Sequence, residues 1–204
     1  FYNCRSLQHI TLPANLEVLG EYAFYGCHNL LDITLPSSLK ILQPSTFYGC
    51  KSLKKISIPD NIKDISYSCF KNCISLEEAI LGSGIRAIGQ YAFYGCIQLK
   101  EITIPDNVSI IGDSVFKKCT NLKNLTIHNG VSNIGYGAFM GCTSLKSVKI
   151  PDSVDFMSPC TFYNCSNLKE VILSKQLNHI PDSAFSNCTQ LENIVLHSGI
   201  TKIQ

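Results

Sequence analysis

Residues 92–108 read Ala-Phe-Tyr-Gly-Cys-Ile-Gln-Leu-Lys-Glu-Ile-Thr-Ile-Pro-Asp-Asn-Val, and this pattern returns every 23 residues along the 204-residue chain. Phe93, Cys96 and Leu99 each have a counterpart of the same residue type in every repeat. A fixed period without insertions is typical of a solenoid, in which one structural unit stacks on the next. The repeated phenylalanines are Phe1, Phe24, Phe47, Phe70, Phe93, Phe116, Phe139, Phe162 and Phe185.

Each repeat contains the pattern of one short strand that ends at a turn. Ile102 and Ile104 alternate with polar residues, which is the two-residue period of a strand. Pro105 then ends the strand, because proline fixes its own backbone angle and donates no ladder hydrogen bond. Two later aliphatic residues, Val108 and Ile111, complete an apolar stripe. One stripe is too thin to form a core, so we expect the repeats to stack with parallel strands about 4.8 Å apart.

Cysteine recurs three residues after each phenylalanine, and we predict that this ladder is structural. Neighbouring coils would bring the thiols close enough for disulfides, but an odd ladder cannot pair completely and no Cys-x-x-Cys metal motif occurs. Free cysteine behaves as a small apolar group. Cys69 is expected to be buried as well, and Cys160 is the one thiol expected to be exposed, while the redox state of the ladder stays open. The ladder comprises Cys4, Cys27, Cys50, Cys73, Cys96, Cys119, Cys142, Cys165 and Cys188.

Length and composition favour one folded domain. The formal net charge is +2, 45% of the residues are hydrophobic, and Gly and Pro fall at turn positions. We predict a single array over residues 1–204, with eight full repeats over 1–184 and a partial ninth over 185–204. Because the chain begins in mid-repeat without Met, and Phe1 and Ile203 are core residues, we expect an excerpt of a longer protein whose caps lie outside it.

The repeated motif resembles the BspA-type leucine-rich repeats found in many microbial surface proteins. The resemblance covers the whole chain, since Ala-Phe, Cys, Leu, Ile-x-Ile-Pro and the later aliphatic pair recur in order. It implies a repeat solenoid, a right-handed leucine-rich-repeat coil with one short parallel strand per 23-residue repeat. These strands would form a concave sheet, with turns and short helical or second-strand pieces on the convex side. The turn proline is replaced at Gly82, His128, Ser174 and His197, which we expect to alter local turns only.

The outward positions of the predicted concave sheet are the candidate partner-binding residues. Side chains that flank the inward Ile-x-Ile pair point away from the core, and their identity varies between repeats, as it would on any unconstrained surface. Lysine also recurs just after the core leucine, where it either forms a basic stripe or simply discourages association between sheets. The candidates are Lys100, Glu101, Thr103, Lys123, Asn124, Thr126, Lys146, Lys149, Lys169, Ile172 and Val195.

Two other surface features leave alternatives open. Tyrosines that follow the core phenylalanine, as in Tyr25 and Tyr48, can pack against one another or anchor a protein or glycan. Of four Asn-x-Ser/Thr triplets, the one at Asn107 is the best glycosylation candidate because it lies in a turn. Asn124 is expected on a strand, and the remaining two triplets precede buried cysteines.

No catalytic, cofactor-binding or metal-binding residues are predicted. The five histidines occupy different repeat positions, and neither a Ser-His-Asp set nor a Gly-rich phosphate loop stands out. Glu77 and Glu78 fit a solvated strand edge. The nearly balanced charge argues against a nucleic-acid surface, and no apolar run approaches the ~20 residues of a membrane span. We therefore expect no enzyme, no cofactor, no nucleic-acid partner and no membrane insertion by this segment.

The expected function is protein binding, as an adhesion or recognition module of a microbial surface protein. Its partner would be an extracellular-matrix or cell-surface protein, with a glycan as a further candidate. The extracellular location follows from the resemblance alone, so an intracellular scaffold or regulatory domain stays an alternative, as does a passive spacer. Within the array, Ala79 fills a core position that is Ile, Leu or Val in every other repeat. The fourth coil is therefore expected to be underpacked or drawn toward its neighbours.

Overall fold

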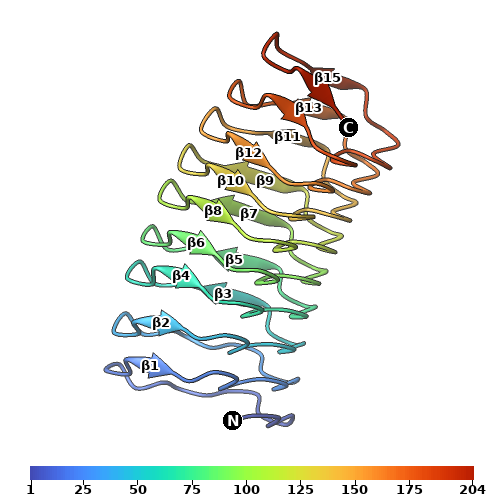
Figure 1. The fold of residues 1–204 in the computed structure, drawn as a ribbon. Helices are drawn as coiled ribbons and strands as arrows, with labels where there is room; N and C mark the ends of the chain where they lie inside the picture. Colours follow the sequence, from blue (N-terminus) through green and yellow to red (C-terminus); the bar gives the residue numbers. More distant parts are fainter.

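The computed structural model describes all residues, Phe1–Gln204, as a solenoid whose successive coils stack along one axis (Figure 1). Every coil is built from strands and turns, and no helix is present. The predicted repeat solenoid is therefore confirmed. For the second side of each coil the sequence allowed either a short helical piece or a second strand, and the structure has a strand there. No helix of the length and apolar character that a bilayer crossing requires is found.

The strands predicted from the Ile-x-Ile pattern form the first series, which we call the long strands. They pair in parallel between equivalent positions of adjacent coils, so Thr103 lies opposite Thr126. The ladder is divided into a four-stranded sheet, β3-β5-β7-β9, and a three-stranded sheet, β11-β13-β15. The long strands are β3 (Lys55–Ser57), β5 (Glu78–Ile80), β7 (Glu101–Ile104), β9 (Asn124–Ile127), β11 (Ser147–Lys149), β13 (Glu170–Ile172) and β15 (Asn193–Val195).

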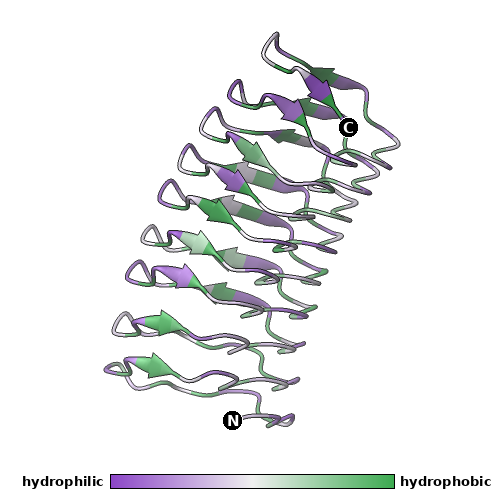
Figure 2. Ribbon diagram, viewed as in Figure 1, coloured by the Kyte–Doolittle hydropathy of each residue, from purple (hydrophilic) through white to green (hydrophobic).

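A second series of two-residue strands, the short strands, follows the turn in each coil. Its outward position varies between apolar and polar, so that β1 and β2 are green and β4 is purple in Figure 2. Seven of the strands form one sheet, and β14 pairs with β16 separately. The short strands are β1 (Val18–Leu19), β2 (Ile41–Leu42), β4 (Asp64–Ile65), β6 (Ala87–Ile88), β8 (Ile110–Ile111), β10 (Asn133–Ile134), β12 (Phe156–Met157), β14 (His179–Ile180) and β16 (Lys202–Ile203).

Stacked phenylalanines run through the core between the two strand series. The rings of Phe70 and Phe93 lie 5.2 Å apart, centre to centre, with planes only 11° from parallel, and the other neighbouring pairs are similar. The seven phenylalanines of the repeat position from Phe24 to Phe162 are completely buried. The two ends of the solenoid are more exposed than its middle, because no further coil covers them in the structure. Phe1 is 61% exposed and Ile203 is 66% exposed. Continuous apolar stacking thus replaces the closed core of a globular domain.

The cysteine ladder lies beside the phenylalanines and contains free thiols. The thiol of Cys96 donates to the backbone oxygen of Phe70, and the equivalent contact recurs from Cys27 to Cys188. Cys69 is buried, as predicted. The expectation that Cys160 is the one exposed thiol was wrong, because Cys160 is half-buried and Cys4 is exposed at the uncovered first coil.

Two positions in each coil have a left-handed backbone. One precedes the core phenylalanine by two residues, as at Tyr91 (φ 58°), and the other precedes the ladder cysteine, as at Gly95 (φ 71°). Glycine and asparagine fill the second position in most coils, since they tolerate this conformation best. Lys118 (φ 64°) is the exception in that position.

Candidate partner-binding site

The outward residues of the long strands form one surface, which we call the long-strand face. All eleven predicted partner-binding residues are exposed on it or at the edge where its strands begin. The pairing of the strands aligns them into columns, so that Lys149, Ile172 and Val195 follow one another across β11, β13 and β15. The structure therefore brings the predicted residues together on one side of the solenoid.

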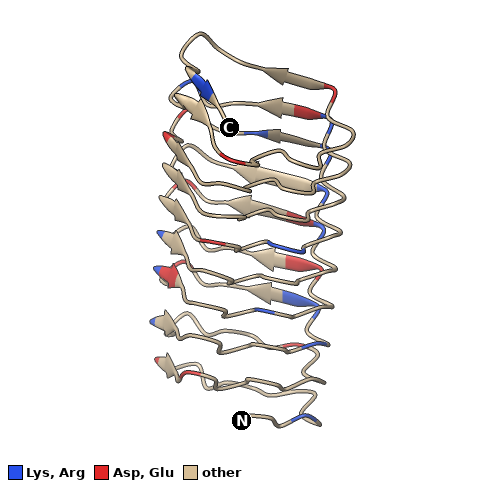
Figure 3. Cartoon of the chain, turned by 45° about the vertical axis from the view of Figure 1, so that its right-hand side comes forward, with Lys and Arg blue, Asp and Glu red and all other residues tan.

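The lysines that follow the core leucine form a column along the edge of this face, and carboxylates neutralise part of its charge. Lys100 forms an ion pair with Glu77 at 2.5 Å, and Lys169 forms one with Glu192 at 2.9 Å. Both acids occupy the same repeat position as the lysines, one coil away. Lys123 and Lys146 form no ion pair. In Figure 3 the positive residues recur along the right-hand edge, where the long strands begin, and negative residues lie among them.

Exposed aliphatic side chains lie among these polar residues. Ile80 on β5 is 46% exposed, Ile172 on β13 is 48% exposed and Val195 on β15 is 77% exposed. All three occupy the outward position that holds Thr or Ser in several other coils. The long-strand face thus carries apolar side chains at defined points.

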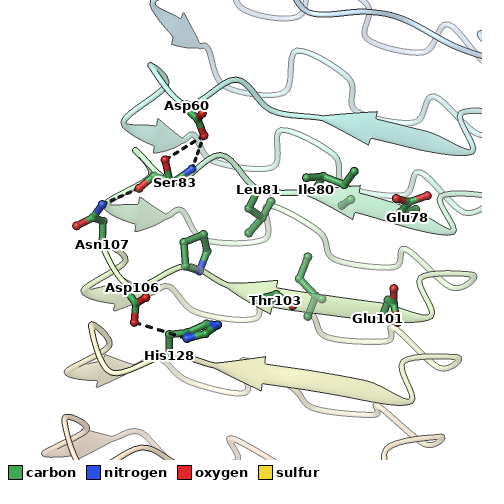
Figure 4. A pocket seen from close by; sticks show the side chains of 13 residues that line it. Asp60, Glu78, Ile80, Leu81, Ser83, Glu101, Thr103, Asp106, Asn107 and His128 are labelled. Carbon is green, nitrogen blue, oxygen red and sulfur yellow. Dashed lines mark hydrogen bonds and ion pairs between the residues drawn. The ribbon is translucent and has the colours of Figure 1, made fainter.

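A hollow of about 600 Å³ opens on this face between the coils of β5 and β7, and the sequence pattern did not predict it. Its apolar part comes from Ala79, Ile80, Leu81 and Ile102. Four carboxylates, together with hydroxyl, amide and imidazole groups, line the remainder (Figure 4). The polar lining consists of Asp60, Glu78, Ser83, Glu101, Thr103, Asp106, Asn107 and His128.

Small residues lie beside the hollow in the fourth coil. Ala79 points into the core at the predicted position and is 7% exposed, which confirms the strand register there. The strand β5 pairs with β7 only at Glu78 and Glu101, whereas β7 and β9 pair over four residues. Gly82 stands where proline ends the strand in other coils, and its backbone lies close to Pro59. The pairing between these two strands is therefore limited to Glu78 and Glu101.

The carboxylates of the hollow differ in their environment. Asp60 accepts hydrogen bonds from the backbone nitrogen and the hydroxyl of Ser83, at 2.7 and 3.0 Å. These bonds favour the ionised form and lower the pKa of Asp60. Asp106 lies 3.6 Å from the Nδ1 atom of His128.

The two glutamates complete the acidic lining, and only one of them is paired. Glu78 is paired with Lys55 at 2.9 Å, while Glu101 has no ion-pair partner. The hollow is therefore acidic at neutral pH, and Glu101 and Asp60 are free to meet a positive group.

Asn107, the glycosylation candidate, lies at the rim of the hollow. Its side-chain nitrogen donates to the backbone oxygen of Ser83 at 2.7 Å, and the residue is exposed in a turn. Asn124 lies on β9, as expected. No group of three or more His, Cys, Asp or Glu side chains is placed to hold a metal ion.

Comparisons with known proteins agree with the repeat pattern and the coil geometry. The BspA type Leucine rich repeat region matches the chain in six copies, over residues 1–123 and 86–204. None of the curated proteins matches the chain. Among solved structures, a leucine-rich repeat protein from Bacteroides ovatus is similar at 30% identity and a TM-score of 0.87, over 95% of this chain.

Two other bacterial leucine-rich repeat proteins are also similar. The T. pallidum leucine rich repeat protein is 31% identical, with a TM-score of 0.74 over 79% of this chain and 78% of its own. A protein from Eubacterium ventriosum is 25% identical, with a TM-score of 0.75 over 96% of this chain and 63% of its own. The chain spans only 52% of the Bacteroides ovatus protein.

Proposed function

Because the chain belongs to the BspA-type leucine-rich repeat family, we propose that it is a non-enzymatic protein-binding module of a microbial surface protein. It acts in adhesion or recognition, and it binds a host or partner protein through the long-strand face. Repeat solenoids present an extended surface of this kind, on which each coil contributes a few variable side chains. The location at the cell surface is part of the proposal.

The hollow between β5 and β7 is the observation that supports this function most. It combines an apolar wall, formed by Ile80 and Leu81, with the carboxylates of Asp60 and Glu101. A partner's lysine or arginine fits such a surface, because its aliphatic stem packs on apolar atoms while its charged end reaches the carboxylates. An inserted side chain surrounded by neighbouring contacts is how protein interfaces concentrate binding energy.

The unpaired lysines supply the second part of the surface. Lys123 and Lys146 follow the hollow along the same edge and are not neutralised by a neighbouring carboxylate. A partner with a basic side chain for the hollow and acidic residues one or two coils away would match both regions. Opposite charges on the two surfaces also raise the association rate and exclude partners of the wrong charge pattern.

The test is binding of the purified array to a panel of extracellular-matrix and cell-surface proteins. A variant that carries Lys100→Glu, Lys123→Glu and Lys146→Glu is compared with the unchanged protein at physiological salt. Saturable binding that the variant loses supports recognition through the long-strand face. No saturable binding to any member of the panel contradicts the proposal, and it would favour an intracellular scaffold or a passive spacer instead.

A further inference from the structure

A second groove, of about 430 Å³, follows the phenylalanine turns of the first three coils and shares no residue with the hollow. In each coil a tyrosine stands on one side of a glycine or asparagine and a basic residue on the other. In the second coil these are Tyr25, Gly26 and His28. The groove is lined by Tyr2, Asn3, Arg5, Tyr25, Gly26, His28, Tyr48, Gly49, Lys51 and Asn72.

The tyrosines form a continuous stack along the groove. The ring centres of Tyr2 and Tyr25 are 5.0 Å apart with planes within 8°, and those of Tyr25 and Tyr48 are 4.7 Å apart within 15°. Because the ring faces cover one another, mainly the ring edges and the hydroxyl groups of the tyrosines line the groove. An aromatic edge carries positive partial charge and a phenol donates hydrogen bonds. This wall therefore attracts anions and does not offer a flat apolar face.

The opposite wall is positive and has no internal counter-charge. Arg5, His28 and Lys51 occupy one repeat position in successive coils, which holds Ile74 and Ile97 in the next two. Neither Arg5 nor Lys51 forms an ion pair, and no Asp or Glu lines the groove. Elsewhere the chain does pair its lysines with carboxylates, as it does for Lys40, Lys55, Lys100, Lys169 and Lys175.

A further lysine stands at the end of the groove. Lys71 takes the tyrosine position of the fourth coil, and its Nζ atom lies 5.7 Å from the ring centre of Tyr48 and 4.8 Å from that of Tyr91. Burial together with the charges of Lys51 and Arg5 lowers the pKa of His28. The neutral form of His28 is therefore favoured, and the positive charge of the groove comes from Arg5, Lys51 and Lys71.

We propose that this groove binds an acidic polysaccharide, with the carboxylates of alternate sugar rings facing Arg5 and Lys51, which lie two coils apart. Arg5 and Lys51 lie two coil spacings apart, about 9.6 Å, close to the length of two sugar rings, after which the carboxylates of an extended uronate chain return to the same side. An extended acidic peptide advances about 3.3 Å per residue, so side chains on its same side return at about 6.6 Å and lose register with the coils. Tyrosine and asparagine side chains would bind the sugar hydroxyls.

Titration calorimetry with an oligogalacturonate, which carries one carboxylate per ring, tests this site. We expect saturable binding at physiological salt and a loss of about tenfold or more in affinity for the double variant Arg5→Glu and Lys51→Glu. The matched control is Lys63→Glu with Lys202→Glu, which changes the net charge equally outside the groove and should leave the affinity unchanged. Neutral dextran should not bind.

Three outcomes would overturn the proposal. The first is no saturable binding of the oligogalacturonate. The second is an equal loss in both double variants, which would mean attraction by net charge alone. The third is binding of polyglutamate as tight as that of the oligogalacturonate, which would assign the groove to an acidic peptide. Protein binding through the long-strand face is measured separately, so its failure would leave this result intact.

Discussion

The Sγ atom of Cys96 lies 3.2 Å from the backbone oxygen of Phe70, one coil earlier, and donates a hydrogen bond to it. The same oxygen also accepts a hydrogen bond from the backbone nitrogen of Cys73. The ladder therefore combines apolar packing with a weak bond from each coil to the one before it. Cysteine is suited to this position because it is small and apolar and still carries a donor.

Replacing a central ladder cysteine should destabilise the array. Cys96→Ala removes a fully buried thiol and its bond, so we expect the free energy of unfolding to fall by about 1 to 2 kcal/mol. Chemical denaturation monitored by circular dichroism measures the change. Cys4→Ala is the matched control, since that thiol is exposed, and it should have almost no effect. An equal effect of both variants would contradict the structural role of the ladder.

The buried thiols should also make stability depend on alkaline pH. Burial raises the pKa of Cys73, Cys96 and Cys119 far above that of a free thiol, so the folded chain keeps protons that the unfolded chain releases above pH about 8.5. Stability is then fully present below that pH and is lost as the pH rises toward the raised values. We expect the unfolding temperature to fall between pH 8 and 10, less steeply in Cys96→Ala. A flat profile would mean that the thiols are accessible in the folded state.

Filling the fourth coil should stabilise it. Ala79→Ile places the side chain found in equivalent coils beside the hollow, and we expect a gain of up to about 1 to 2 kcal/mol in the free energy of unfolding. Thermal unfolding measures it. Ile102→Val, in the next coil, is the control for a change of core volume and should cost about 0.5 to 1.5 kcal/mol. Destabilisation by Ala79→Ile would show that the coils have already closed around the alanine.

The left-handed backbone at Lys118 should be a site of local strain. Lys118→Asn keeps the conformation with a residue that tolerates it, so we expect stabilisation by about 0.5 to 1 kcal/mol. Gly141→Ala is the converse test, because φ is 75° there and an added Cβ would find its nearest neighbour at 3.8 Å. This variant should be destabilised through the backbone alone. Denaturant titrations of the two variants should therefore move in opposite directions.

The repetitive part of the fold could be predicted because each coil has the same residue types at the same core positions. Phe93, Leu99 and Ile102 lie in the core as their spacing indicates, and the position of Ala79 confirms the strand register. The second strand could not be distinguished from a helical piece, since two aliphatic residues three apart fit either. Two-residue strands give too short a pattern to decide.

The local features of the surface were harder to predict. The hollow is lined by residues of several coils, and no single residue determines it. The ion pair between Glu77 and Lys100 could have been found, because both residues occupy the same position in adjacent coils. The same comparison between coils would have shown the column of Arg5, His28 and Lys51. These features arise between repeats, and examination of one repeat at a time misses them.

The most direct test of partner binding compares the two strand faces at the same coils. Thr103 and Thr126 lie opposite each other on the long-strand face, and Ile110 and Asn133 do so on the short strands. The double change to arginine at either pair adds the same charge. For any panel protein that binds, we predict that Thr103→Arg with Thr126→Arg abolishes binding, while Ile110→Arg with Asn133→Arg preserves it. Binding that survives the first change and is lost with the second would contradict recognition through the long-strand face.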